Sequence, residues 1–112
     1  MLIYKIFRQP EWDAFCAAGT TSGAPIDLAD GFIHFSTAGQ VVETAARHFR
    51  DEGDLVLLAC DADDLGPALR WEPARQGALF PHLYRALSRD EILWGKPLPH
   101  GPGGHVFPEG SW

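Results

Sequence analysis

The pattern of apolar and polar positions changes character within residues 31–49. Residues 31–35 alternate, which places Phe32 and His34 on one face of an extended chain. After Thr37, apolar residues recur at the spacing of one helix face, at Val41, Val42, Ala45, Ala46 and Phe49. The pattern therefore predicts a strand that leads directly into a helix.

The junction between this strand and this helix is a candidate binding site. Thr37 followed by Gln40 fits a capping box, so the helix is predicted over 37–49. A helix N-terminus presents unpaired N–H groups that suit an anion or a polar ligand group. His34 and Ser36 lie beside it, although most strand-to-helix junctions bind no ligand. We therefore treat His34, Ser36 and Thr37 as candidates.

Four further segments predict the rest of the sheet. Residues 2–7 alternate with both faces largely apolar, which predicts a strand inside the sheet. Residues 55–60 form a continuous apolar run and predict the central strand, and 68–72 predict a short one. Residues 79–87 are extended but contain Pro81, which predicts an edge strand or two short pieces.

The segment before residue 31 predicts a helix and a loop. Pro10 suits the first turn of a helix and Gly19 suits its end. Residues 20–30 contain glycine and proline and show no sustained period, so they predict a surface loop.

The C-terminal part predicts short elements and a tail. Residues 88–91 predict a capped helical turn, and 92–94 a strand that the chain leaves over 95–98. We predict one α+β domain over residues 1–98, with a twisted mixed or antiparallel sheet and two helices. A Gly- and Pro-rich tail follows over 99–112.

Composition fits a single folded domain. The chain has 112 residues, of which 46% are hydrophobic, enough for one core. No run approaches the roughly 18 apolar residues of a membrane span, and residues 1–8 lack the features of a signal peptide. Cys16 and Cys60 resemble buried small hydrophobes more than a disulfide pair. We expect a cytoplasmic monomer that does not bind membranes.

The formal net charge of −6 argues against an extended nucleic acid as a partner, because proteins that bind nucleic-acid backbones usually carry a basic stripe. The basic residues of this chain are instead scattered, and a few of them could line a pocket for one small phosphorylated ligand. They are Lys5, Arg8, Arg47, Arg50, Arg70, Arg75, Arg85, Arg89 and Lys96.

The strong motifs of catalysis and metal binding are absent from the sequence. There is no phosphate-binding Gly-rich loop, no Gly-x-Ser-x-Gly motif and no His/Cys spacing typical of a metal site. What remains is a set of polar side chains on apolar elements: Tyr4, His34, Glu72, His82 and Tyr84. Each could be a core or rim residue with a polar tip. If they share a function, they should line one concave pocket.

The sequence resembles domain-of-unknown-function family 952 over roughly residues 1–98. The resemblance rests on a box of five residues that begins at Phe80 and ends at Tyr84, and on several shorter matches. These are Tyr4-Lys-Ile, Trp12, Gly31-Phe-Ile-His-Phe-Ser and Ala46-Arg-His-Phe.

A more distant similarity concerns the middle of the chain. The motif His34-Phe-Ser, the Ala-rich helix and the segment from Leu55 to Leu65, an apolar strand that ends in an Asp-Ala pair, are similar to the tRNA 2′-phosphotransferases. Those enzymes belong to the ADP-ribosyltransferase-like superfamily, so the resemblance implies a split, curved sheet that grips NAD in a cleft. It also implies that His34 hydrogen-bonds a ribose or the adenylate portion, with Ser36 and Thr37 at the cleft wall.

Two main functions remain open. One is an ADP-ribosyltransferase-like enzyme that acts on NAD, as a substrate and without a metal, or on an ADP-ribosyl derivative. Its catalytic candidates are His34, Glu72 and His82, and its substrate-binding candidates are Tyr4, Ser36, Thr37 and Tyr84. The other is a module that binds a nucleotide-like metabolite without turnover. A structural or interaction protein without a pocket ligand is a third, weaker hypothesis.

Overall fold

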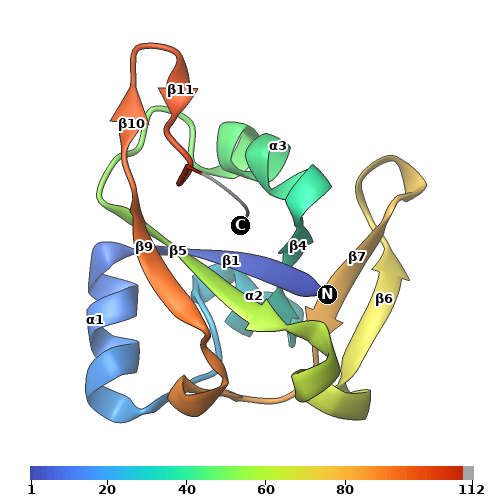
Figure 1. The fold of residues 1–112 in the computed structure, drawn as a ribbon. Helices are drawn as coiled ribbons and strands as arrows, with labels where there is room; N and C mark the ends of the chain where they lie inside the picture. Colours follow the sequence, from blue (N-terminus) through green and yellow to red (C-terminus); the bar gives the residue numbers. More distant parts are fainter. Residues whose placement is uncertain (110–112) are drawn as a thin grey trace.

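In residues 1–109, which the computed structural model describes, two antiparallel sheets, two short strand pairs and three α-helices form the fold (Figure 1). The strands are β1 (Leu2–Arg8), β2 (Thr20–Thr21), β3 (Ile33–His34), β4 (Ser36–Thr37), β5 (Leu55–Asp61), β6 (Leu69–Pro73), β7 (Leu79–Leu83), β8 (Leu87–Ser88), β9 (Trp94–Leu98), β10 (His100–Gly101) and β11 (Gly104–His105). The α-helices are α1 (Gln9–Ala18), α2 (Pro25–Asp30) and α3 (Ala38–His48). The 3-10 turns are η1 (Ala62–Ala68), η2 (Arg75–Gly77) and η3 (Arg89–Glu91). The predicted α+β class with antiparallel pairing is confirmed.

The larger sheet has the strand order β4-β1-β5-β9, so β1 and β5 are its inner strands. They pair along seven residues, from Leu2 opposite Asp61 to Arg8 opposite Leu55. The first six residues of β5 are buried on both faces, which is why the segment reads as an uninterrupted apolar run. Both strands were predicted inside the sheet, and both predictions are confirmed.

The alternation of β1 divides the core into two clusters. Tyr4 and Ile6 pack with α3 on one face of the sheet, while Ile3 and Phe7 pack with α1 on the other. The smaller sheet, of order β3-β7-β6, joins the α1 cluster through Ile33 and Leu83. Burying each such side chain stabilises the fold by about 1.5–3 kcal/mol.

The strand predicted over 31–35 is split between the two sheets. β3 pairs with β7 in the smaller sheet, and after the single residue Phe35 the chain enters the larger sheet as β4, where Ser36 lies opposite Tyr4. The helix predicted next is confirmed as α3, and the N–H of Thr37 donates to Oε1 of Gln40 at 3.0 Å.

The loop predicted over 20–30 is wrong in its second half, because α2 lies there and brings the number of α-helices to three. Pro25 occupies its first turn, and Gly31 ends it with a left-handed φ of 85°. Six residues are less than two turns. Such a helix is too short to show a hydrophobic period, and its buried residue is the charged Asp27.

The prediction that Pro81 marks an edge strand is also wrong, since β7 is the middle strand of the smaller sheet. The N–H of Phe35 donates to the Pro81 carbonyl oxygen at 3.0 Å. The nitrogen and oxygen of a strand residue point to the same side, so the missing N–H of Pro81 faces the side on which β3 ends at His34. The extended stretch does form two pieces, β7 and β8, but it breaks after Leu83.

The last predicted strand is displaced along the chain. The sequence pattern placed it over 92–94, whereas β9 begins at Trp94 and continues through Gly95. A Cβ at Gly95 would lie 2.9 Å from the ring of Trp12, so glycine is required there by the packing of α1. After β9, residues 100–105 form the β10–β11 hairpin, and Phe107 packs on the α3 cluster. The end of the predicted tail, 110–112, lies outside the described residues.

Within residues 1–109, no helix combines the length and the apolar composition that crossing a membrane requires.

Candidate ligand pocket

A pocket of about 900 Å³ lies between α3, the smaller sheet and the start of α2. The chain reaches it from both sheets, because Tyr4 lies on β1 and His34 on β3, one residue before the crossing at Phe35. The polar face of the smaller sheet forms one wall, and the connection between β6 and β7 closes one end. Figure 1 shows the β6–β7 hairpin beside α3.

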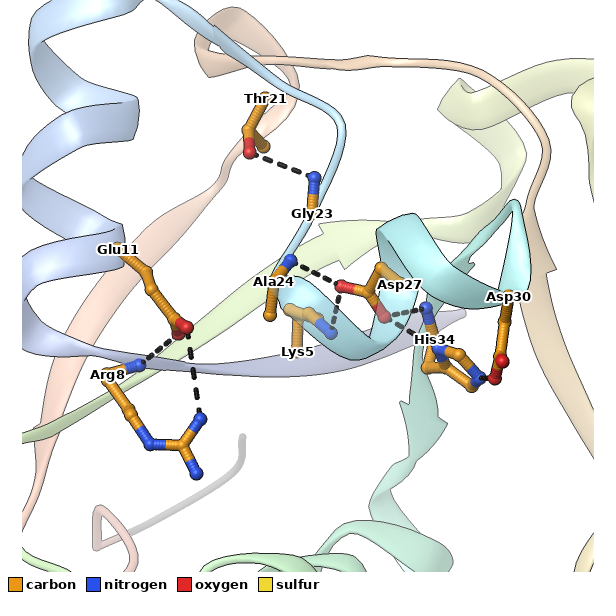
Figure 2. Close-up of polar contacts among 9 residues, drawn as sticks. All are labelled: Lys5, Arg8, Glu11, Thr21, Gly23, Ala24, Asp27, Asp30 and His34. Carbon is orange, nitrogen blue, oxygen red and sulfur yellow. Dashed lines mark hydrogen bonds and ion pairs between the residues drawn. The ribbon is translucent and has the colours of Figure 1, made fainter.

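Asp27 organises the polar groups at one side of the pocket (Figure 2). Its Oδ2 accepts from the N–H of Ala24 at 2.7 Å and lies 2.6 Å from Nζ of Lys5. Its Oδ1 accepts from the backbone N–H of His34 at 3.1 Å and lies 2.6 Å from Nδ1 of the same residue. The Asp27 side chain is fully buried, and four contacts satisfy its two oxygens. One carboxylate thus fixes α2, β1 and β3 relative to one another.

The pKa of Asp27 reflects these contacts. Burial raises it, but the hydrogen bond from His34 and the positive charge of Lys5 outweigh burial, and the pKa lies below its usual value. Burial lowers the pKa of the Lys5 ammonium, against the opposing charge of Asp27. Asp27 therefore acts as a buried anion that anchors a buried cation.

His34 is held between two carboxylates at the pocket wall. Its Nδ1 faces Asp27, and its Nε2 lies 3.0 Å from Oδ2 of Asp30, which is exposed at the end of α2. The His34–Asp30 edge therefore offers a ligand an imidazole ring and a carboxylate that accepts hydrogen bonds.

His82 belongs to a second polar group on the same face of the smaller sheet. It lies directly opposite His34, with the ring centres 5.5 Å apart. Its Nδ1 lies 2.8 Å from Oε1 of Glu72, which also accepts from the Tyr84 hydroxyl at 2.7 Å. The hydrogen bonds from Tyr84 and His82 lower the pKa of Glu72. Phe32 packs between the two groups, 4.2 Å from the His82 ring.

Arg75 and Thr44 meet at the end of the pocket near α3. Nη2 of Arg75 donates to Oγ1 of Thr44 at 3.0 Å, and the guanidinium lies over the Phe80 ring at 4.9 Å. Thr44 Oγ1 also lies 2.9 Å from Oγ of Ser36. The β6–β7 connection, α3 and β4 are joined at this point.

Four of the seven candidates from the sequence line the pocket: Tyr4, His34, Ser36 and His82. Glu72 and Tyr84 lie outside the lining: Glu72 contacts the lining residue His82, and Tyr84 contacts Glu72. Thr37 is also outside, at the start of α3. The structure therefore brings His34 and His82 to the same side of the sheet, while their roles stay predictions.

Sequence reasoning missed Asp27, Asp30 and Thr44, and it named Lys5 and Arg75 only among the scattered basic residues of which a few could line a pocket. A signal for the two aspartates existed: proline at the first helical position, an acid two residues later and glycine after the end are typical of a short helix. No local signal marked Thr44 and Arg75, because their contact joins residues 31 positions apart.

No group of three or more His, Cys, Asp or Glu side chains that could hold a metal ion occurs in the described part of the chain. The pocket has groups that can contact an organic ligand: cationic side chains, three histidines, a hydroxyl cluster and aromatic walls.

Comparison with solved structures finds similar folds in protein CC0527 from Caulobacter crescentus. Its crystal structure has 50% sequence identity, covers 94% of this chain and 92% of that chain, and superimposes with a TM-score of 0.90. Its solution NMR structure also has 50% identity, with coverage of 93% and 90% and a TM-score of 0.84. Among curated proteins, none matches this chain. The family model described as "Protein of unknown function (DUF952)" matches residues 6–95, so the chain belongs to the DUF952 family.

Proposed function

We propose that the pocket binds a small phosphate-bearing metabolite, and that NAD or an ADP-ribosyl compound is the class of ligand. The observation that carries this proposal is the charge of the lining. It includes four basic side chains and one carboxylate, that of Asp30. Lys5 pairs with Asp27, and Arg8 and Arg47 each contact a glutamate, whereas Arg75 has no acidic partner among residues 1–109. The guanidinium of Arg75 is therefore an uncompensated positive charge at the pocket of a chain whose formal net charge is −6.

The size and the walls of the pocket also support a metabolite. Its volume is within the roughly 300–1,000 Å³ that is typical of small-molecule sites. Phe35, Phe49 and Phe80 give aromatic walls against which a base or a sugar can pack. The carboxylate of Asp30, held by His34, can accept from a ribose hydroxyl.

The choice of NAD or ADP-ribose rests on the resemblance to the ADP-ribosyltransferase-like superfamily. Two sheets that meet at Phe35, with His34 beside the crossing, agree with the split sheet that this superfamily would imply. The proposal needs neither an extended nucleic acid, nor a membrane, nor a second copy of the chain.

A thermal-shift series with NAD, ADP-ribose and AMP tests this function. A ligand that binds only the folded state stabilises it by about 2.7 kcal/mol at a hundredfold excess over Kd. For a domain near this size, that corresponds to a rise in Tm on the order of 10 °C. The His34→Ala variant should lose about 1 kcal/mol or more of this stabilisation, because it removes the ring that holds the Asp30 carboxylate in place for the ribose hydroxyl.

His100→Ala is the matched control, since His100 lies on β10 and is not part of the lining. Its ligand-induced shift should equal that of the wild type. If no adenine compound stabilises the folded wild-type protein at millimolar concentration, the proposed ligand class is wrong, and the structural or interaction role becomes the better hypothesis.

Turnover of the ligand is a second candidate function, favoured by the contact of His82 with Glu72. In the tautomer of neutral imidazole that donates from Nδ1 to the Glu72 carboxylate, Nε2 of His82 is the nitrogen that can accept a proton. In hydrolysis of NAD, the oxygen of water would bond to C1′ of the ribose as the bond to the nicotinamide nitrogen breaks. Nε2 would take the proton from water, and nicotinamide and ADP-ribose would leave. Glu72 would act by holding His82.

Release of nicotinamide from NAD distinguishes the two candidates. If the protein is an enzyme, it should release nicotinamide steadily, and His82→Gln should reduce the rate by about a hundredfold or more. NAD should still raise the Tm of this variant. Binding without turnover predicts a thermal shift and no product with either protein. Activity that His82→Gln leaves unchanged would exclude His82 as the base.

A further inference from the structure

Arg75 carries a guanidinium nitrogen that is buried and has no hydrogen-bond partner among the described residues, namely Nη1. Its other terminal nitrogen donates to Thr44. Arg8, Arg47 and Arg85 each contact a glutamate, whereas no acidic side chain within residues 1–109 pairs with Arg75. Folded proteins rarely leave a buried N–H of a charged group without an acceptor, so this nitrogen points to an acceptor that residues 1–109 do not supply.

The guanidinium is held in place before any ligand arrives. Phe80 packs under its plane, and Thr44 accepts from Nη2. The Thr44 hydroxyl in turn donates to the carbonyl oxygen of Gln40, one turn earlier in α3, at 3.1 Å. A planar guanidinium fixed in this way matches two oxygens of a phosphate group, with little loss of side-chain entropy on binding.

Arg75 has further basic residues nearby. Arg47, which pairs with Glu43, and His48 lie on the next turn of α3 and also line the pocket. Burial lowers the pKa of His48, and the positive charges of Arg75 and nearby cationic groups lower it further. The carboxylate of the lining, Asp30, contacts His34 at the α2 side. The pocket thus has a cationic end at α3 and a mixed polar edge at α2.

We propose that Arg75 and Thr44 form the phosphate subsite of this pocket, so that a phosphoryl group of the ligand binds at the α3 end and the uncharged sugar lies toward His34. Arg75 is the ligand-contacting residue, and Thr44 is a positioning residue that orients it. This inference rests on the proposed function, and it adds which end of the pocket binds the phosphoryl group of the ligand. It can nevertheless be tested without any nucleotide.

Inorganic pyrophosphate is the direct probe, measured by calorimetry and by thermal shift with the full chain. Arg75→Gln removes the charge but keeps a polar side chain, and should weaken binding by about tenfold or more, as expected for loss of a charge-assisted hydrogen bond. Arg75→Lys should restore binding only in part, because a lysine cannot donate as a planar fork. Thr44→Val should weaken binding, and Thr44→Ser, which retains the hydroxyl, should restore it.

Arg50→Gln is the charge-matched control, since Arg50 is exposed and lies outside the lining. Its affinity for pyrophosphate should equal that of the wild type. The subsite is wrong if the wild-type protein does not bind pyrophosphate, or if Arg75→Gln and Arg50→Gln bind it equally well.

A parallel series of adenosine, AMP and ADP separates this proposal from the proposed function. If affinity rises with the phosphates in the wild type but not in Arg75→Gln, both are supported. If adenosine binds as tightly as ADP and Arg75→Gln has no effect, the adenine part of the proposed ligand stands, whereas the phosphate part and the subsite are wrong. If pyrophosphate binds through Arg75 while adenosine adds nothing, the subsite stands and the adenine ligand class is wrong.

Discussion

At the scale of single residues, the buried pair of Lys5 and Asp27 is the contact on which the shape of the pocket depends. Only 6% of the Lys5 side chain and none of the Asp27 side chain is exposed. Two buried charges gain little net stability from each other, because both lose hydration. Their pairing does determine geometry, since Asp27 also binds the backbone and the ring of His34. We interpret the pair as a device for orientation.

Asp27→Asn should destabilise the protein by about 3–5 kcal/mol, because it leaves the buried Lys5 ammonium without a counter-charge. Urea unfolding at neutral pH measures the loss. Asp30→Asn is the matched control: Asp30 is exposed on the same helix and contacts the same histidine, so its effect should be within about 0.5 kcal/mol. Adding Lys5→Met to Asp27→Asn should recover part of the loss. Equal stability of the two asparagine variants would contradict the prediction.

Asp27 should also make stability depend on acid. Its folded pKa lies below the value of about 3.9 in the unfolded chain. As the pH falls, the unfolded chain therefore takes up the proton first, and the stability present at neutral pH is lost as the pH passes through the folded pKa. Urea midpoints between about pH 5 and pH 2 should fall more steeply for the wild type than for Asp27→Asn. Parallel curves would show that other carboxylates cause the acid sensitivity.

At the scale of elements, α1 packs closely against β9, which is an edge strand of the larger sheet. Gly95 lies opposite Leu58, and its missing side chain makes room for the indole of Trp12. Gly95→Ala should cost about 1–3 kcal/mol, because the rigid ring and the strand must move apart. Gly103→Ala is the control: nothing lies within 4 Å of the added Cβ, and its effect should be small. Similar unfolding midpoints for the two variants would mean that α1 moves without cost.

The elements that could be predicted are those long enough to show a pattern of apolar residues. α3 and β5 have enough residues for a helical or a continuous apolar pattern, and both were found. α2 was not, since six residues show no period and its buried residue is charged. The central position of β7 also escaped prediction, because it depends on where β3 ends and not on Pro81 itself.

The candidate site divides in the same way. His34 and His82 could be selected because a polar residue on an apolar strand is conspicuous in the sequence. The Arg75–Thr44 contact could not, because it exists only after the β6–β7 hairpin packs beside α3. Contacts of this kind depend on the arrangement of elements, which a single sequence does not display.

At the scale of the whole molecule, the two sheets share one of the two core clusters, and their shortest covalent connection is the single residue Phe35. Ile33 and Leu83 of the smaller sheet are buried in the same cluster as Ile3 and Phe7 of the larger sheet. The pocket lies where the sheets meet, so its walls hold their positions only while both sheets are folded. Opening of the central strand should therefore coincide with loss of the pocket.

The two cysteines allow this cooperativity to be measured. Cys60 is fully buried in β5, and burial, with the charge of Glu91, raises the pKa of its thiol to about 12, whereas Cys16 on α1 is partly exposed. Because the thiolate is the reactive form, iodoacetamide at neutral pH should modify Cys16 readily. It should modify Cys60 roughly a thousandfold or more slowly, through global opening. Asp27→Asn should accelerate labelling of Cys60 by the same factor by which it raises the unfolding equilibrium constant. It should leave the labelling rate of Cys16 unchanged. Mass spectrometry of the peptides measures both rates, and comparable labelling of the two thiols in the folded protein would show that the central strand opens independently of the rest.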